Sequence, residues 1–203
     1  MLDKDKINLT LDTLDGDAIA DVLKDNSRIK TSVNNWLEKF NLAVDVEEFK
    51  EVIHHLKVKQ NNLNLDITDV GFGISQILPV IIQGFLSPSN STTIIEQPEI
   101  HLHPKIQAEL ADLFIDIVKK SSKDKKIIIE THSEYLLKRL RRRISEGVIS
   151  PKDVAICLFN PSNGEESAYI NEIEIEEKGF FDWPLEFYGG ELLKDTTEFL
   201  KNQ

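Results

Sequence analysis

Residues 92–104, TTIIEQPEIHLHP, contain the side chains whose types and spacing are best suited to chemistry. A run of β-forming residues ends in Glu96, and an apolar strand that ends in a carboxylate can hold a hydrated magnesium ion, which prefers oxygen ligands. Gln97 follows at the position where a second carboxylate would act as a general base on water. An amide cannot accept a proton at neutral pH. The stretch predicts a metal-directed acid, and the alternative is an ordinary strand end with solvated carboxylates.

Histidines in the same stretch suggest a rival kind of site. On a strand, His101 and His103 would point to one side, which is an arrangement that binds zinc. With His132 and an acid they would form a metal-dependent hydrolase, the second function that the residues allow. The sequence HLHP lies between an expected strand and an expected helix, so the period-two geometry is not expected there. We therefore favour magnesium over zinc.

A glycine-containing stretch, TDVGFGISQILP at 68–79, precedes these residues. Gly71 and Gly73 allow the backbone to approach a ligand closely, and the helix that follows would aim its first amides at that ligand, as at many phosphate sites. Ser75 would add a hydroxyl group. The alternative is a simple turn with Ser75 as the N-cap of the helix. Pro79 removes one early hydrogen bond and does not forbid the helix.

The stretch IIIETHSEYL at 127–136 places His132 just after an apolar strand. A histidine on this turn can donate a hydrogen bond to a phosphate oxygen, and the alternative is that Thr131 or Ser133 merely caps the next helix. Five cations follow in KRLRRR at 138–143. They could contact a nucleic-acid backbone. In a chain of net charge -11, we favour a solvated helix face with its cations near the helix C-terminus.

The elements that must position these residues follow from hydrophobic periodicity. We expect helices at 17–24, 28–40 and 74–86, a helix beginning at Pro104, one after Ser133 and a short terminal helix; we expect strands at 50–58, before Glu96, at KIIIE (126–130), at DVAICLF and at SAYINEIEI. KIIIE has a fully apolar centre at 127–129, like a strand buried on both sides of a parallel sheet. The order strand, helix, strand, helix, strand predicts an α/β fold with a parallel sheet. Ligands of such sheets bind at the carboxyl ends of the strands, where Glu96, Glu130 and His132 fall.

Composition limits the cellular setting. The chain has 203 residues, enough for one sizeable domain, and its net charge of -11 argues against general attraction to nucleic acid or anionic membranes. The single cysteine, Cys157, excludes an internal disulfide framework and fits a reducing compartment. We find neither a signal peptide nor an apolar run long enough to span a bilayer, and we expect a cytoplasmic protein.

Together, the order and spacing of these motifs resemble the C-terminal half of an ABC-type AAA ATPase of the RecF-like, OLD-like and SMC-like branch. GFGISQ resembles the signature motif, in which Gly73 and Ser75, with Gly71 and Gln76 beside them, would contact the γ-phosphate of ATP across a dimer. TTIIE resembles the Walker B strand, with Glu96 as the magnesium-directed acid and Gln97 in the slot of the catalytic glutamate. IHLHP, with His103, resembles the D-loop that touches the opposite subunit, and ETHSE resembles the turn of the switch histidine, His132.

This resemblance implies ATP and Mg²⁺ as cofactors and a P-loop NTPase-like fold with flanking helices. It implies three parts: a helical lid-side segment at 1–66, the motif-bearing core at 67–175 and a small C-terminal domain of unknown function at 176–203. GFFDWPLEFYGG is similar to that small domain, which occurs in bacterial anti-phage systems of the Septu kind. The implied partners are a second copy of the chain, DNA and a nuclease, with no membrane.

Two departures from the family pattern matter. The sequence contains no G-x-x-x-x-G-K-[ST] phosphate-binding loop, which suggests that this chain is the C-terminal half of an ATPase and binds ATP poorly without an N-terminal half or a full-length homologue. Gln97 replaces the general-base glutamate, so either hydrolysis is slow or another group serves, with Glu99 the nearest candidate. A shifted motif, in which Glu99 binds the metal, stays open. A third hypothesis is a non-catalytic remnant that acts as an interaction module.

Overall fold

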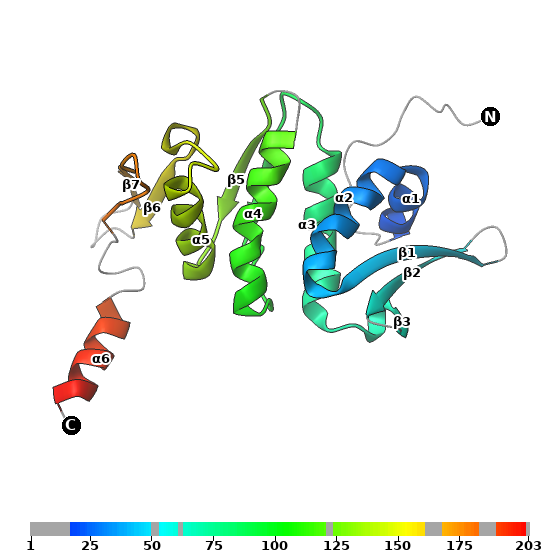
Figure 1. Cartoon of the computed structure of the whole chain (residues 1–203), viewed down its shortest axis with the longest axis horizontal. Coiled ribbons are helices and arrows are strands. Elements are labelled where there is room, and N and C mark those ends of the chain that lie inside the picture. The colour runs from blue at the N-terminus through cyan, green and yellow to red at the C-terminus, as the bar shows by residue number, and fades with distance from the viewer. Residues whose placement is uncertain are drawn as a thin grey trace. The chain divides into compact units, whose positions relative to one another are not determined.

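The structure is a computed structural model that describes residues 17–49, 53–60, 63–120, 124–160, 168–182 and 190–201. Its contacts divide the chain into two compact units, Met1–Ser133 and Glu134–Gln203, each of which has its own helices and strands (Figure 1). The resemblance implied three parts, with boundaries at 66 and 175. That division stays a prediction.

The first unit begins with a pair of helices that the periodicity predicted. Helix α1 spans Asp17–Asp25 and α2 spans Ser27–Leu37, followed by a 3-10 turn, η1, at Glu38–Phe40. Asn26 separates the two helices, and its Oδ1 accepts a hydrogen bond from the N–H of Ile29 at 3.1 Å, so it caps α2. The apolar face of α2 is buried, as its spacing indicated: Ile29, Val33, Trp36 and Leu37.

A three-stranded antiparallel sheet follows these helices. It consists of β1 (Leu42–Phe49), β2 (Ile53–Gln60) and β3 (Leu63–Asp66), in the order β1-β2-β3. Val44 and Val58 are register partners and both are buried, because α2 lies against β1. The strand predicted at 50–58 is confirmed as β2, but β1 and β3 were not predicted, and the segment up to residue 66 is not helical throughout. A strand in an antiparallel sheet can place one face on a helix and the other in water, so charged residues interrupt its apolar run and weaken the strand signal.

Asp45 ties this sheet to α2. Its carboxylate accepts hydrogen bonds from Lys30 Nζ at 2.5 Å and Lys59 Nζ at 2.8 Å, and these two bonds hold the pKa of Asp45 well below its usual range. A carboxyl group whose pKa is depressed by folding stabilises the protein above its unfolded-state pKa of about 3.9, and this contribution is lost as the pH falls further.

Asp45→Asn should therefore lower the free energy of unfolding by about 0.5–1 kcal/mol at pH 7, a value discounted because the side chain is 33% exposed. The difference from wild type should shrink as the pH falls below about 4. Urea titrations at pH 7 and pH 3 measure both effects. Asp116→Asn, which breaks an exposed pair with Lys120, is the control and should cost less. A pH-independent effect of Asp45→Asn would contradict the assignment.

The centre of the first unit alternates helix and strand. A 3-10 turn, η2 (Ile67–Asp69), leads into helix α3 (Phe72–Leu86), which is followed by β4 (Thr92–Glu96), α4 (Pro104–Lys120) and β5 (Lys126–Glu130). Strands β4 and β5 pair in parallel, as predicted, from Thr92 beside Lys126 to Glu96 beside Glu130. Apolar side chains of α3 and α4 are fully buried and form much of the core: Ile77, Leu78, Ile81, Ile82, Leu110, Leu113 and Ile117.

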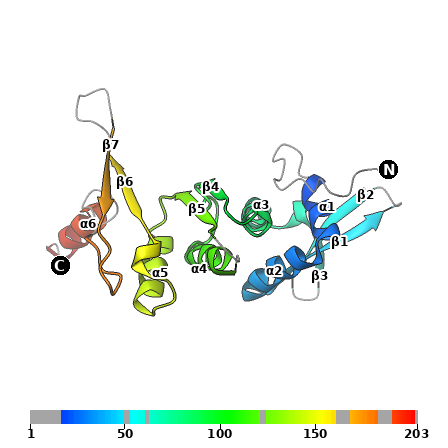
Figure 2. The ribbon, with the colours of Figure 1, turned by 90° about the horizontal axis from the view of Figure 1, so that it is seen from above.

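One face of the β4–β5 pair is covered and the other is not. Figure 2 shows α4 along one face of the two strands, on which Ile95 is buried. Ile94 and Ile128 are register partners on the opposite face, where they are 68% and 55% exposed. The prediction that KIIIE is buried on both sides was therefore wrong for this structure, because no element described in the first unit packs on that second face.

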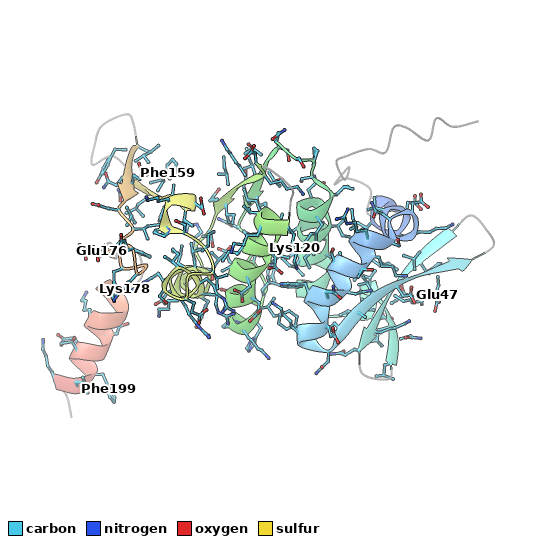
Figure 3. The ribbon with its side chains drawn as sticks, turned by 45° about the horizontal axis from the view of Figure 1, so that its top comes forward. Glu47, Lys120, Phe159, Glu176, Lys178 and Phe199 are labelled. Carbon is cyan, nitrogen blue, oxygen red and sulfur yellow. The ribbon has the colours of Figure 1, made fainter. Side chains whose placement is uncertain are left out.

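The second unit contains α5 (Glu134–Ser145), a 3-10 turn, η3 (Pro151–Asp153), β6 (Ile156–Asn160), β7 (Tyr169–Ile173) and α6 (Gly190–Lys201). These positions confirm the predicted elements, and within this unit β6 pairs antiparallel with β7. Phe159 and Phe199 are largely exposed (Figure 3). Most of the aromatic tail at 179–190 lies outside the described residues. No helix in the described parts of the chain is long and apolar enough to cross a membrane.

Candidate functional site

The carboxyl ends of β4 and β5 bring two carboxylates side by side. Glu96 and Glu130 are register partners, and partners in adjacent parallel strands lie about 4.8 Å apart with their side chains on the same face. Both are exposed, on the face opposite Ile95. The sequence predicted Glu96 as the metal-directed acid; the adjacent Glu130 was noted at a strand end but not assigned a role. Its signal was present, since TTIIE and KIIIE both end in glutamate.

The chain leaves β4 through residues 97–103, which we call the connecting loop. Gln97 and His101 have left-handed backbone conformations, with φ of 45° and 59°. Such values are uncommon for residues other than glycine and persist where surrounding contacts hold them. Gln97 N–H donates to Glu130 O at 2.9 Å, and Leu102 N–H donates to Glu99 O at 3.1 Å. The connecting loop is therefore an ordered turn held at the end of the parallel pair.

Glu99 lies inside this loop and is buried, with 7% of its surface exposed. Its Oε1 accepts a hydrogen bond of 2.6 Å from the backbone N–H of His132. Its Oε2 is also buried and makes no hydrogen bond with the residues that the structure describes. Glu99 thus joins the connecting loop to the turn after β5.

Gln107 of α4 makes a second connection between the same two segments. Its Nε2 donates to Leu102 O at 2.9 Å, and its Oε1 accepts a hydrogen bond of 2.7 Å from the hydroxyl of Ser133. Sequence reasoning did not single out Gln107. No local pattern marks it, because its partners lie 5 and 26 residues away in the chain.

The start of α3 touches the other side of the connecting loop. A Cβ atom on Gly73 would lie 3.1 Å from His101 O and 3.0 Å from Leu102 Cδ2, whereas one on Gly71 would meet no atom within 4 Å. The close approach of the backbone therefore favours glycine at position 73, and the space beside Gly71 is open. The two segments predicted to bind phosphate are thus in contact through the loop.

The helix N-cap is Gly71 and not Ser75, which corrects the simpler interpretation of that serine. Gly71 provides no side-chain cap, so the first amides of α3 depend on other partners. Ser75 lies in the first turn and is half-buried, and Gln76 is exposed. Pro79 is accommodated inside the helix. An uncapped helix N-terminus is a suitable place for a phosphate group.

The histidines do not assemble into a zinc site. His101, His103 and His132 are exposed, and among the described residues no three His, Cys, Asp or Glu side chains lie close enough together to hold a metal ion. The left-handed conformation of His101 breaks the period-two geometry that an HxH pair would need. His103 Nδ1 instead accepts a hydrogen bond from the N–H of Lys105 at 3.2 Å, at the start of α4.

The basic segment of α5 is largely neutralised within the second unit. Lys138 pairs with Glu134, and both Arg142 and Arg143 pair with Glu146, whose carboxyl pKa they lower. Arg141 stacks over the Phe180 and Phe181 rings and donates to Gly179 O. These local partners support the interpretation of KRLRRR as a solvated helix face.

Oxygen ligands at the strand ends suit magnesium better than zinc. Mg²⁺ is commonly held by one or two carboxylates together with water and phosphate oxygens, and Glu96 and Glu130 supply two such carboxylates on one open face. The adjacent turn with His132 and the start of α3, which has no side-chain cap, offer N–H groups of the kind that phosphate accepts hydrogen bonds from. The residues present therefore fit a magnesium-nucleotide complex.

Comparison with known structures agrees with this fold. The chain is similar to a structure from work on the ATP-driven dimerization and DNA-stimulated activation of SMC ATPases, with 12% identity and a TM-score of 0.56, covering 88% of this chain and 97% of that one. It is also similar to an SMC head bound to the C-winged helix domain of ScpA (14%, TM-score 0.52) and to an SMC head with a coiled coil and joint from Pyrococcus yayanosii (10%, TM-score 0.51). These matches cover 85% and 86% of this chain.

The chain spans 52% and 30% of the last two proteins. The fold is that of an α/β P-loop NTPase and resembles an SMC head. A family model described as AAA ATPase domain matches residues 4–137, and the chain belongs to this family. No curated protein matches the chain.

Proposed function

We propose that this chain contributes the signature, Walker B and switch-histidine part of an ATP-driven dimerisation switch, and that another segment or polypeptide supplies the phosphate-binding loop. The observation that carries the proposal is the connecting loop, which contacts Gly73 on one side and binds the His132 turn through Glu99 on the other. Membership of the AAA ATPase domain family supports ATP as the ligand.

In this proposal each residue has a distinct task. Glu96, with Glu130 beside it, would hold Mg²⁺, which when bound offsets negative charge on the phosphates. His132 would donate a hydrogen bond to the γ-phosphate held by its own subunit. Gly73, Ser75 and Gln76 would bind the γ-phosphate held by the other subunit, at the start of α3. Closure of two copies around ATP would follow.

Hydrolysis should be slow in such a switch. Gln97 cannot accept a proton, and Glu99, the nearest alternative base, is buried and engaged with the N–H of His132. A general base must reach the attacking water, which favours a positioning role for Glu99. Closure of the dimer would then be controlled by the binding of ATP more than by its hydrolysis. A nuclease or DNA is the partner that we propose for the closed form, in genome defence or repair, on the basis of the resemblance to Septu-like ATPases.

The test is ATP-driven dimerisation of the complete assembly, in which this chain is combined with the polypeptide that carries the phosphate-binding loop. His132→Ala and Ser75→Arg should each weaken the ATP-dependent dimer about tenfold or more, the first by removing a phosphate contact and the second by blocking the signature surface. Analytical ultracentrifugation with and without ATP and Mg²⁺ measures the effect.

Two variants serve as matched controls for this test. Ser91→Arg introduces the same side chain at the opposite end of β4, and His55→Ala removes a histidine from β2. Both should dimerise like wild type. Unchanged ATP-driven dimerisation in both His132→Ala and Ser75→Arg would overturn the proposed function.

A further inference from the structure

Glu99 has an environment that a packing residue does not need. It is buried, with 7% of its surface exposed, its side chain ends in a carboxyl group, and its hydrogen bond to the N–H of His132 is short at 2.6 Å. Burying a carboxylate is costly unless it is well bonded, and a methionine could fill a similar volume without that cost. Hydrogen bonds from an N–H to a carboxylate are among the strong ones in proteins. The polar interaction of Glu99 is therefore its distinguishing property.

The bond fixes the backbone on which a candidate phosphate-binding side chain sits. His132 is exposed, so its ring is accessible, while its N–H is held by Glu99 from a segment 33 residues earlier. The neighbouring Ser133 is held separately through its hydroxyl, which donates to Gln107. Two hydrogen-bonded bridges thus set the position of the turn at 131–133 relative to the connecting loop.

The connecting loop meets the start of α3 on its other side, through the close approach of Gly73 to His101 O. A displacement of the loop would therefore move both the backbone that carries His132 and the surface against which α3 begins. In an ATP-bound dimer these two segments would face different nucleotides. Glu99 lies on the path of contacts between them.

We propose that Glu99 is a positioning residue, which fixes the position of the switch histidine, His132, relative to the connecting loop and the start of α3. This inference rests on the proposed function and adds to it a residue that controls how well His132 is oriented for phosphate. The carboxylate acts through the backbone of His132. It requires an acceptor at Oε1, and it requires no proton transfer by Glu99.

The first experiment uses the 203-residue chain alone and does not depend on ATP. Amide hydrogen exchange, followed by ¹H–¹⁵N NMR, should show a protected His132 N–H in wild type. Glu99→Met, which keeps the volume and removes the acceptor, should speed that exchange tenfold or more, whereas Glu99→Gln, which keeps an acceptor oxygen, should retain most of the protection.

Controls separate positioning from general loosening of the fold. The N–H of Gln97, which donates to Glu130 O, should exchange at the wild-type rate in Glu99→Met. Gln107→Met breaks the other bridge and should leave His132 protected. If Glu99 only fills the core, Glu99→Met will leave the exchange of His132 unchanged, and this result overturns the inference.

The second experiment places Glu99→Met in the complete ATPase assembly and measures ATP-driven dimerisation. Glu99→Met should weaken the ATP-driven dimer as much as His132→Ala does. The double variant, Glu99→Met with His132→Ala, should form a dimer no weaker than that of either single variant, because both changes remove the same contact between His132 and phosphate. Glu99→Gln should behave like wild type. Losses that multiply in the double variant overturn the inference. A wild-type assembly that does not respond to ATP overturns the proposed function instead, while the exchange experiment still decides the role of Glu99.

Discussion

Gly73→Val should lower the free energy of unfolding by about 2–3 kcal/mol, the upper part of the range for overpacking a close contact. The reason is geometric, because a Cβ atom added at Gly73 would lie 3.0 Å from Leu102 Cδ2 and 3.1 Å from His101 O. The two methyl groups of valine would extend further into the same space. The backbone oxygen cannot turn aside as a flexible side chain can. Urea or thermal unfolding of the purified chain gives the measurement.

Gly71→Val is the matched control, two residues away at the N-cap of the same helix. Its Cβ would meet no atom within 4 Å, and its φ of -50° is one that valine adopts, so the expected cost is about 1 kcal/mol or less. If the space beside Gly71 receives a nucleotide, Gly71→Val will fold normally and still impair ATP-driven dimerisation. Equal stability of the two variants would contradict the close approach described for Gly73.

Gly84→Ala should destabilise the protein by about 1–2 kcal/mol, although alanine favours a helix interior over glycine by about 1 kcal/mol. Gly84 lies in α3 beside α4, and an added Cβ would clash with Ile117 Cδ1 of α4. Ile117 is 1% exposed, so its side chain has little room to move away. Overpacking should therefore outweigh the gain in helix propensity.

The explanation can be tested by removing the atom that clashes. Ile117→Val deletes Cδ1 and alone should cost about 0.5–1.5 kcal/mol. The double variant, Gly84→Ala with Ile117→Val, should be more stable than the sum of the two single effects by about 1 kcal/mol or more. Additive effects would show that Gly84 is not limited by Ile117. Unfolding titrations of the four proteins complete the cycle.

Gly73→Val and Gly84→Ala both test whether α3 is closely packed, on one side against the connecting loop and on the other against α4. Gly84 permits its approach to α4, and Gly73 permits its approach to the connecting loop. Lys125 adds a third restraint, because its Nζ donates to Gly84 O and Phe85 O near the end of α3, and burial lowers the pKa of this lysine. The start of α3, where we propose that phosphate binds, is thus part of a firmly packed element.

Much of the motif-bearing core was predictable from residue order alone. Apolar residues that recur about every 3.6 residues predicted α3 and α4, and runs of β-forming residues predicted β4 and β5. Each of these signals lies within one short segment, so it can be recognised without knowing what the segment packs against. Alternation of strand and helix predicted the parallel pairing, since a crossover helix returns the chain in the same direction. The strand-end position of Glu96 followed from the same reasoning.

Other features arise from contacts between distant segments, and local patterns do not encode them. Residue order alone was enough to predict that Glu96 and Glu130 end two strands, and to show which family of ATPases the motifs resemble. The folded structure was needed to show that Glu99 is buried against the N–H of His132, that Glu130 lies beside Glu96, that β6 pairs with β7, and that Ile128 is exposed. The physical reason is that burial and register depend on which surfaces meet in the folded chain, and periodicity within one segment does not specify its neighbour.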